Sequence, residues 1–453
     1  MKLALAILLI AVPLAAADAP SNQAEAASAA AGPIPLSMKR AVEVALAPQG
    51  NAAVKLADEA LRQARERSIQ ARAALLPGVS GAFAYQSRTA DLAAQGLNTL
   101  AIPIPGFHFP TFVGPFSVMD ARLSGSESVL DLSAIRRYQA SKSGVAATKD
   151  DAETTGEQVA GMVARAYLAA VKADADVESA AANVTLSEAV LQQAGNQKAA
   201  GTGTGIEITR AKVQLANDRQ HQLEAANARR AAYLRLLRAM NMRLDLEVQL
   251  TDKLAYMPAD AVTTGQAAAD ALKSRPDFQA QQERERTARY SASATKLERL
   301  PTVAAFGDYG SSGSGLDNAM PTRTYGISVR VPIFDGGRID SRREESFSQY
   351  RAEQVRTSDL RAQIELDVRL ALDAMKSAGD QVRVAREGLD LAENELAQAR
   401  RRYEAGVTNS IEVTDAQTRL ERARDNQTAA LYQYNVARID LAQAMGKVRS
   451  TVQ

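Results

Sequence analysis

Apolar residues recur every three or four positions along two long stretches without proline, residues 135–198 and 339–403. Each stretch would form a helix of roughly 95–100 Å at about 1.5 Å per residue, which is too long for a compact domain. The series of the second stretch and of the segment after it, apolar except at Gln427, runs Val382, Ala385, Leu389, Ala392, Leu396, Ala399, Tyr403, and then Leu420, Ala423, Gln427, Ala430, Tyr434, Ala437, Leu441, Ala444. Alanine at alternate positions lets helices approach closely, so the pattern predicts coiled-coil hairpins.

One glycine-containing motif occurs twice, each time after a long stretch. It reads AGTGTGIEIT around Gly201 and AGVTNSIEVT around Gly406. Glycine readily adopts the left-handed conformation that ends a helix, so each hairpin should turn at its glycine. A second motif, Leu-Pro-x-Val, begins at Leu76 and again at Leu300. The chain is therefore an internal duplication.

Shorter helical patterns precede each long stretch. We expect helices over 37–47 and 52–75 in the first copy and over 265–300 in the second. Pro276 lies inside the last of these, and proline removes a backbone hydrogen bond and clashes with the preceding turn. We therefore expect that helix to break or kink at Pro276.

Alternation of apolar and polar residues replaces the helical pattern directly after Pro77 and Pro301. It predicts four strands, two in each copy, at about 79–86, 117–125, 302–310 and 325–333. Strands of ~9–11 residues with one apolar and one polar face fit a transmembrane barrel. A half-buried soluble hairpin has the same period, so the pattern alone leaves both possibilities open.

The fourth strand shows the alternation most clearly. Ile327 and Val329 share one face, whereas Ser328 and Arg330 share the other. Phe306 falls on the polar face of the third strand, so the phase of that strand is not defined by the pattern.

The number of strands limits how they can enter a membrane. A bacterial barrel needs at least ~8 strands to close, and an open sheet edge in lipid leaves backbone groups without partners. If the four strands enter a membrane, several chains must therefore share one barrel. The loops at 87–116 and 311–324 would then face the outside, because the helices extend from the opposite end.

Composition narrows the functional class. The chain has no Cys, which excludes disulfides, thiolate metal sites, a cysteine nucleophile and a lipid anchor on Cys. Its 54 basic and 52 acidic residues are mixed along the chain and aromatics make up only 5%, so we expect no nucleic-acid partner. Lys2, a short apolar run and Ala15-Ala16-Ala17 predict a signal peptide over 1–17.

Candidate catalytic chemistry is weak. Gly201-x-Gly-x-Gly205 lacks the spacing of either nucleotide-binding fingerprint, so a helical turn is the better interpretation. The two histidines, His108 and His221, lie far apart in sequence and in different predicted regions. A metal or catalytic site needs converging ligands. We therefore expect no catalytic residues, no cofactor, no metal and no enzymatic activity.

Taken together, the signal peptide, the duplicated order of helices and strands, VPIFDGG at 331–337 and YEAG…IEV at 403–413 resemble the TolC family of outer-membrane efflux and type I secretion ducts. The resemblance implies a fold that is mainly α with four strands: long coiled-coil hairpins in an α-barrel, joined to a transmembrane β-barrel shared by a homotrimer. It implies contact with outer-membrane lipid, and two partners: a periplasmic adaptor (membrane fusion) protein and an inner-membrane pump of the RND, ABC or MFS type.

The resemblance also assigns regions to the chain. In order they are a signal peptide, 1–17; a flexible lead-in, 18–36; periplasmic helices, 37–76; a β-hairpin, 77–130; a long helical hairpin with connector, 131–264; periplasmic helices, 265–300; a β-hairpin, 301–334; a long helical hairpin, 335–447; and a tail, 448–453.

Family members close their periplasmic entrance with residues at the hairpin tips. Acids six and nine positions after the second glycine, Gly406, match Glu412 and Asp415 here, and a tyrosine three positions before it matches Tyr403. The acidic partner in the first copy matches Glu207. The resemblance therefore implies a gate in which the Tyr403 hydroxyl donates to Glu207.

This chain departs from the family pattern at one gate position, where Thr408 replaces an arginine. Arg210 stands in the first copy where Asp415 stands in the second, with the opposite charge. Glu207 and Glu412 also have a second interpretation, as acids in the first turn of a helix whose dipole favours them.

The sequence thus predicts a passive export duct across the periplasm and outer membrane for small molecules or polypeptides. The alternative is a periplasmic coiled-coil protein of structural or adaptor type whose strands never enter lipid. The cargo is not indicated, because a water-filled tunnel selects little.

Overall fold

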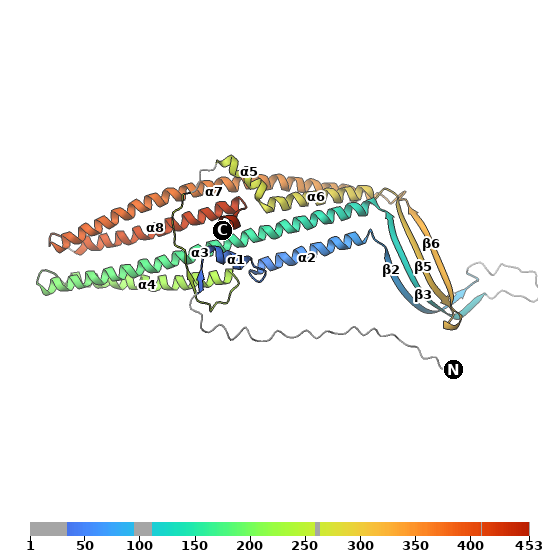
Figure 1. Ribbon diagram of the computed structural model, residues 1–453, viewed down its shortest axis with the longest axis horizontal. Coiled ribbons are helices and arrows are strands. Elements are labelled where there is room, and N and C mark those ends of the chain that lie inside the picture. The colour runs from blue at the N-terminus through green and yellow to red at the C-terminus, as the bar shows by residue number, and fades with distance from the viewer. Residues whose placement is uncertain (1–33, 95–110, 259–262, 409, 453) are drawn as a thin grey trace, which may run out of the picture.

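The computed structural model describes residues 34–94, 111–258, 263–408 and 410–452. The predicted signal peptide and most of the predicted lead-in lie outside the described residues, as does His108. The described part is elongated. Long helices run along most of its length, and a curved sheet stands at one end (Figure 1).

Four long helices form two hairpins, as predicted. α3 (Leu132–Ala199) pairs with α4 (Gly205–Ala239), and α7 (Arg338–Glu404) pairs with α8 (Ser410–Ala444). α3 has 68 residues, which corresponds to about 100 Å. Because α3 also packs against α8, the helices form a layer in the order α4-α3-α8-α7. Both hairpins turn at the end that lies away from the sheet (Figure 1).

Shorter helices continue this layer toward the sheet. α2 (Ala52–Ala73) packs on α3, and α6 (Pro276–Leu297) packs on both α3 and α7, which gives the order α2-α3-α6-α7. α5 (Thr264–Ser274) ends just before Pro276, which is the first residue of α6. The predicted break at this proline is confirmed, because the first turn of a helix tolerates a residue without an N–H.

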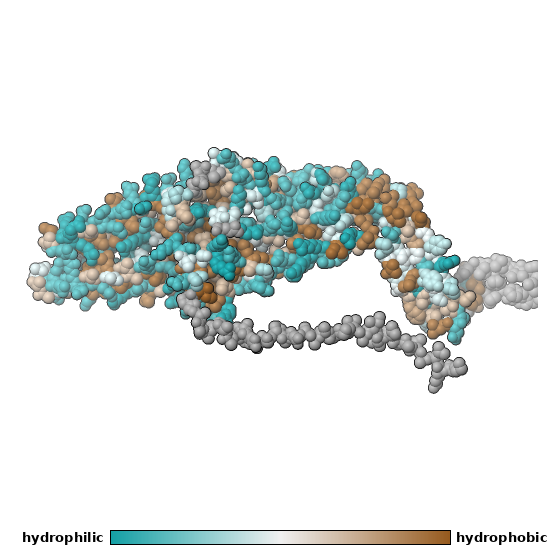
Figure 2. Space-filling model, in the orientation of Figure 1, coloured by the Kyte–Doolittle hydropathy of each residue, from teal (hydrophilic) through white to brown (hydrophobic). Residues whose placement is uncertain are grey.

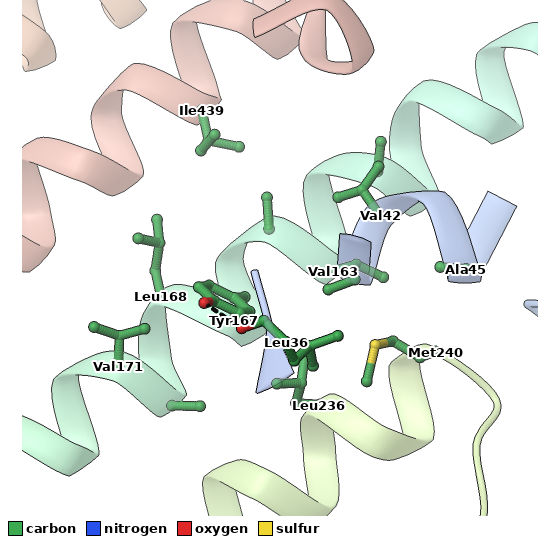
Figure 3. Packing of buried hydrophobic residues seen from close by; sticks show 14 of the residues in the cluster. Leu36, Val42, Ala45, Val163, Tyr167, Leu168, Val171, Leu236, Met240 and Ile439 are labelled. Atoms are coloured by element: carbon green, nitrogen blue, oxygen red, sulfur yellow. Dashed lines mark hydrogen bonds between the residues drawn. The ribbon is translucent and has the colours of Figure 1, made fainter. Parts of the chain in front are cut away.

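Short elements from distant parts of the chain gather midway along the helices. β1 (Ile34–Leu36) pairs in parallel with β4 (Val248–Leu250), and α1 (Met38–Leu46) and α9 (Val448–Val452) pack on α3. We call this region the waist. Its core joins side chains of α1, α3, α4 and α8 (Figure 3).

The waist corrects one prediction. Residues 34–36 were expected to belong to a flexible lead-in, but they form β1. Leu36 is only 3% exposed, and the buried Tyr167 hydroxyl donates to its carbonyl oxygen at 2.9 Å. A strand of three residues is too short to show a period in the sequence, and its order comes from these distant contacts.

The sheet contains both β-hairpins of the duplication. Its strands are β2 (Gly78–Asp91), β3 (Phe112–Leu130), β5 (Thr302–Gly313) and β6 (Met320–Arg330), with a short 3₁₀ turn (Leu316–Asn318) between the last two. Neighbouring strands are antiparallel in the order β2-β3-β5-β6. β2 and β6 are therefore the two edges of the described sheet.

The predicted strand positions need two corrections. β2, β3, β5 and β6 extend well into the segments expected to be loops, 87–116 and 311–324. In addition, β6 ends at Arg330, so Val331 and Ile333 lie beyond it. Pro332 explains the second error, since proline offers no N–H to a strand ladder.

The register places most of the large apolar side chains of the strands on one face, which we call the apolar face. Val303 pairs with Val329, and Ala305 with Ile327, so the predicted phase of the fourth strand is confirmed. Eight large side chains of this face are each at least 59% exposed: Val79, Phe83, Tyr85, Leu123, Tyr309, Tyr325, Ile327 and Val329. Met119 and Val303 of the same face are more buried. Figure 2 shows hydrophobic residues over the sheet and where it meets the helices, whereas the helices are mostly hydrophilic.

The opposite, polar face explains the position of Phe306. Phe306 pairs with Gly326, and a Cβ added at Gly326 would lie 3.0 Å from its ring. The ring thus covers the space above a residue that has no side chain. Elsewhere on this face Arg122 binds Asp120 at 3.0 Å and also pairs with Asp308, which links β3 to β5.

Candidate functional site at the helical tips

The two hairpins end in turns with the same backbone geometry. Gly201 and Gly406 have φ angles of 77° and 71°, in the left-handed region where a side chain would cause strain. α3 and α7 end just before these glycines, and α4 and α8 begin a few residues later. We call these turns and the adjoining helix ends the tip.

A small apolar core joins the two hairpins at the tip. Val190 of α3 and Ala211 of α4 pack with residues of the second hairpin. The buried members from α7 and α8 are Ala392, Leu396, Ala399, Tyr403, Val413, Ala416 and Leu420. The tips of the two repeats therefore touch within one chain.

Glu207 makes a helix-capping contact. Its carboxylate accepts a hydrogen bond from the backbone N–H of Thr204 at 2.8 Å, at the start of α4. This contact satisfies one of the backbone donors that a helix leaves free at its N-terminus. The capping interpretation of Glu207 therefore describes its contact in this structure.

The hydrogen bond expected between Tyr403 and Glu207 is not formed here. Tyr403 is 3% exposed, and its hydroxyl has no hydrogen-bond partner among the described residues. Burial, and after it the negative charge of Glu207, raises the pKa of the Tyr403 hydroxyl. Glu207 thus lies near enough to act on Tyr403 through its charge while its carboxylate caps α4.

Glu412 is held by two residues of its own hairpin. Arg402 forms an ion pair with it at 3.1 Å, and the Thr408 hydroxyl donates to the same carboxylate. Thr408 occupies the position at which the family pattern has arginine. In this chain the positive charge comes instead from Arg402, near the end of α7.

Arg210 and Asp415 line one groove between α4 and α8, together with Val213, Ile411 and Thr414. Among the described residues the structure contains no ion pair between these two opposite charges. Arg210 and Asp415, which occupy equivalent positions of the two repeats, therefore lie on the same surface.

Two further polar groups are buried at the tip without partners in the described part of the chain, the Ser410 hydroxyl and the Gln417 side-chain amide nitrogen. Both residues are at most 6% exposed, and they lie one heptad apart on α8. Each buried group without a hydrogen bond costs about 1–3 kcal/mol. These two buried groups therefore destabilise the packed tip, and exposing them to water would remove that free-energy cost.

Three of these tip residues were not identified from the sequence. Arg402 stands in a run of charges that is typical of a solvated helix face, and only the turn geometry directs it to Glu412. Ser410 and Gln417 lie seven positions apart, so a search for polar residues on a heptad-spaced stripe could have found them.

The described residues do not gather into a metal site, since none of them forms a group of three or more His, Asp or Glu side chains able to bind an ion. His221 is exposed on α4, 3.6 Å from Glu224. None of the described helices is both long and apolar enough to span a bilayer.

Sequence comparison places the chain among exporters. Residues 267–447 match the family model described as "Outer membrane efflux protein". The pyoverdine export outer membrane protein OpmQ of Pseudomonas putida is 25% identical over 406 residues, which cover 85% of this chain and 81% of OpmQ. The alkaline protease secretion protein AprF of Pseudomonas aeruginosa is 21% identical over 321 residues, covering 70% and 67% of the two chains.

Solved structures share the fold. The CmeC outer membrane channel of Campylobacter jejuni superposes with a TM-score of 0.78 at 19% identity, covering 90% of this chain and 85% of CmeC. The outer-membrane channel OprN gives a TM-score of 0.76 at 18% identity, with 90% of both chains covered.

Long helical hairpins attached to an open sheet with an exposed apolar face are the architecture of the outer-membrane channels. Residues 267–447 carry the match to the outer membrane efflux protein family, and the predicted resemblance to the TolC family is confirmed. It is an outer-membrane protein of the efflux and secretion class. The alternative of a periplasmic structural or adaptor protein receives no support from these relatives.

Proposed function

We propose that this chain forms a homotrimeric duct that exports solutes passively, without catalysis. One observation carries the proposal: every layer has two open edges. The helical layer is bounded by α4 and α7 near the tip and by α2 and α7 near the sheet, and the sheet is bounded by β2 and β6. A layer with two different edges can close into a ring when copies join head to tail.

The edge helices carry apolar side chains suited to such joining. α4 exposes Ile206, Val213 and Leu234, and α7 exposes Leu370, Val384 and Leu391. Within each set the spacings are multiples of seven residues, so each set follows one line along its helix. We expect the α7 line of one chain to pack on the α4 line of the next.

The sheet supports a membrane position for one end of the duct. Its apolar face would contact lipid, and its polar face would line a water-filled pore. Four strands per chain are too few to close a barrel alone, and three chains would supply twelve, the number that the family resemblance implies. The helices would then lie in the periplasm, with the tip at the far end.

The tip would meet the proposed partners, a periplasmic adaptor and an inner-membrane pump. OpmQ is named for pyoverdine export and AprF for protease secretion, so relatives with this fold serve both small molecules and polypeptides. A pump that drives such cargo needs a duct whose inner end can open.

A planar-bilayer recording tests the proposed duct. The purified protein should insert from neutral detergent and give discrete, ion-conducting steps. Protein that folds and oligomerises but never conducts would contradict the proposal.

Arg402→Gln is expected to raise the open fraction of the pore and to strengthen block by trivalent cations added from the tip side. Glu412 would lose its positive partner, and the like charges of three chains would repel one another across the axis. An exposed ion pair contributes up to about 1 kcal/mol, so the change should be a few-fold. Single-channel recording measures it. Arg401→Gln, one residue away, is the control, and equal behaviour of the two variants would reject a role for the pair.

Gln417→Leu is expected to lower the open fraction. Leucine has a similar volume and removes a buried amide group without a partner, so the packed tip should gain about 1–3 kcal/mol. Hydrogen exchange in the first turns of α8 should slow in parallel. Gln433→Leu, at an exposed position of the same helix, is the control. Faster exchange in the Gln417 variant would show that the amide stabilises the tip.

A further inference from the structure

A cavity of about 410 Å³ lies at the waist, where α1, the segment after β4, α8 and α9 meet over α3. Its floor is apolar. Tyr167, Leu168 and Val171 of α3 and Ile439 of α8 line it, and each is at most 5% exposed. Figure 3 shows Ile439 extending from α8 toward Leu168, so the floor joins one helix from each repeat.

The rim of this waist cavity is positively charged. Lys39 at the start of α1, Lys253 after β4 and Arg438 of α8 line it. In the part of the chain that the structure describes, none of these three side chains forms an ion pair. The nearby Arg165, by contrast, pairs with Asp440 at 2.8 Å. Three cations without carboxylate partners therefore surround one opening.

Asp252 is the acidic residue of the lining, and its carboxylate is already occupied. It accepts a hydrogen bond from the backbone N–H of Met38 at 2.8 Å, in the first turn of α1. Asn435 likewise donates its amide to the carbonyl oxygen of Ala255 at 3.1 Å. The lining thus retains positive charge at its rim after its internal contacts are made.

We propose that the waist cavity binds a small amphipathic organic anion, with a carboxylate, sulfonate or phosphate head and a compact apolar body. The head would contact Lys39, Lys253 and Arg438, and the body would rest on the floor. The volume falls at the lower end of the ~300–1,000 Å³ range of ligand sites, which suits one ring with a short chain. Attraction between the charges is stronger beside an apolar surface than in water.

Such a ligand would connect the two repeats at the waist, because the cavity has α3 on one side and α8 on the other. Binding to the folded state alone raises stability with ligand concentration. The site lies away from the tip, and the proposal does not depend on how many chains assemble or on whether the duct conducts.

Isothermal titration of the assembled protein in neutral detergent with 4-phenylbutyrate tests the site. We expect saturable binding of one ligand per chain. Neither acetate, which has no apolar body, nor 4-phenylbutanol, which has no charge, should bind in the same range. Lys253→Gln with Arg438→Gln should weaken 4-phenylbutyrate binding by about tenfold or more, because charge-assisted contacts to the head are lost.

A matched variant controls for net charge. Arg351→Gln with Lys376→Gln removes the same charge from exposed positions of α7 and should bind like the parent. Equal weakening in both double variants would show that the effect comes from the net charge of the protein and not from the waist cavity. Equal binding of the alcohol and the carboxylate would show partition into apolar surface. Either result, or no binding by the parent at millimolar ligand, would overturn the proposal.

Discussion

Val384→Glu combined with Leu391→Glu is expected to leave the chain helical but unable to form a stable oligomer. Both side chains are exposed in the single chain and lie on the line of α7 that we assign to contact with α4 of the next chain. Burying an aliphatic side chain contributes about 1.5–3 kcal/mol, and the loss recurs at every interface of a ring. Two buried glutamates would add a desolvation cost.

Sedimentation in detergent, with circular dichroism to report helix content, measures this effect. Ala397→Glu is the matched control, because position 397 is exposed on the same helix but lies off the line of Val384 and Leu391. The control should assemble like the parent. A double variant that also assembles would place the contact between chains elsewhere.

Val329→Arg is the second change for which we expect a large effect. Val329 lies on the apolar face, directly opposite Val303, and is 61% exposed in the single chain. An arginine facing lipid near the midplane of a bilayer costs roughly 2–4 kcal/mol, and each chain of the barrel would bear that cost. Assembly into membranes should therefore fall sharply.

Ser328→Arg provides the comparison for Val329→Arg, since Ser328 is the preceding residue and lies on the polar face. Its arginine would extend into the water-filled pore and should be tolerated. The amount of heat-stable oligomer extracted from membranes measures both variants. Equal tolerance of arginine at the two positions would contradict the assignment of the faces.

The helical hairpins could be predicted closely because their signals are local and repeated. Long stretches without proline set the length of α3 and α7, and one glycine motif set each turn. The faces of the last strand were also predictable, because a regular alternation of apolar and polar residues assigns every residue of the strand to one face.

Other features depend on contacts between distant residues and left weaker signals. β1 exists because Leu36 is buried against α3, more than a hundred residues away in the chain. Phe306 contradicts the alternation of its strand because Gly326 on the neighbouring strand leaves room for its ring. At the tip, the motif located Glu412 but not its partner Arg402, since many arginines precede the turn.

Glu207 shows how one position can fit two interpretations. The motif matched it to a gate residue, whereas its carboxylate in this structure caps α4. The two interpretations correspond to two conformations of the tip, one in which Glu207 caps α4 and one in which it accepts from Tyr403. The second is within reach, because the buried Tyr403 hydroxyl feels the charge of Glu207 and has no hydrogen-bond partner among the described residues. The sequence alone cannot tell which of the two contacts Glu207 makes, because both contacts use the same residues.

Native mass spectrometry of the protein released from neutral detergent tests the central claim most directly. Because the described sheet and helical layer have open edges that only further copies can close, the account predicts a single dominant species of three chains. A folded monomer that stays soluble without detergent would contradict it.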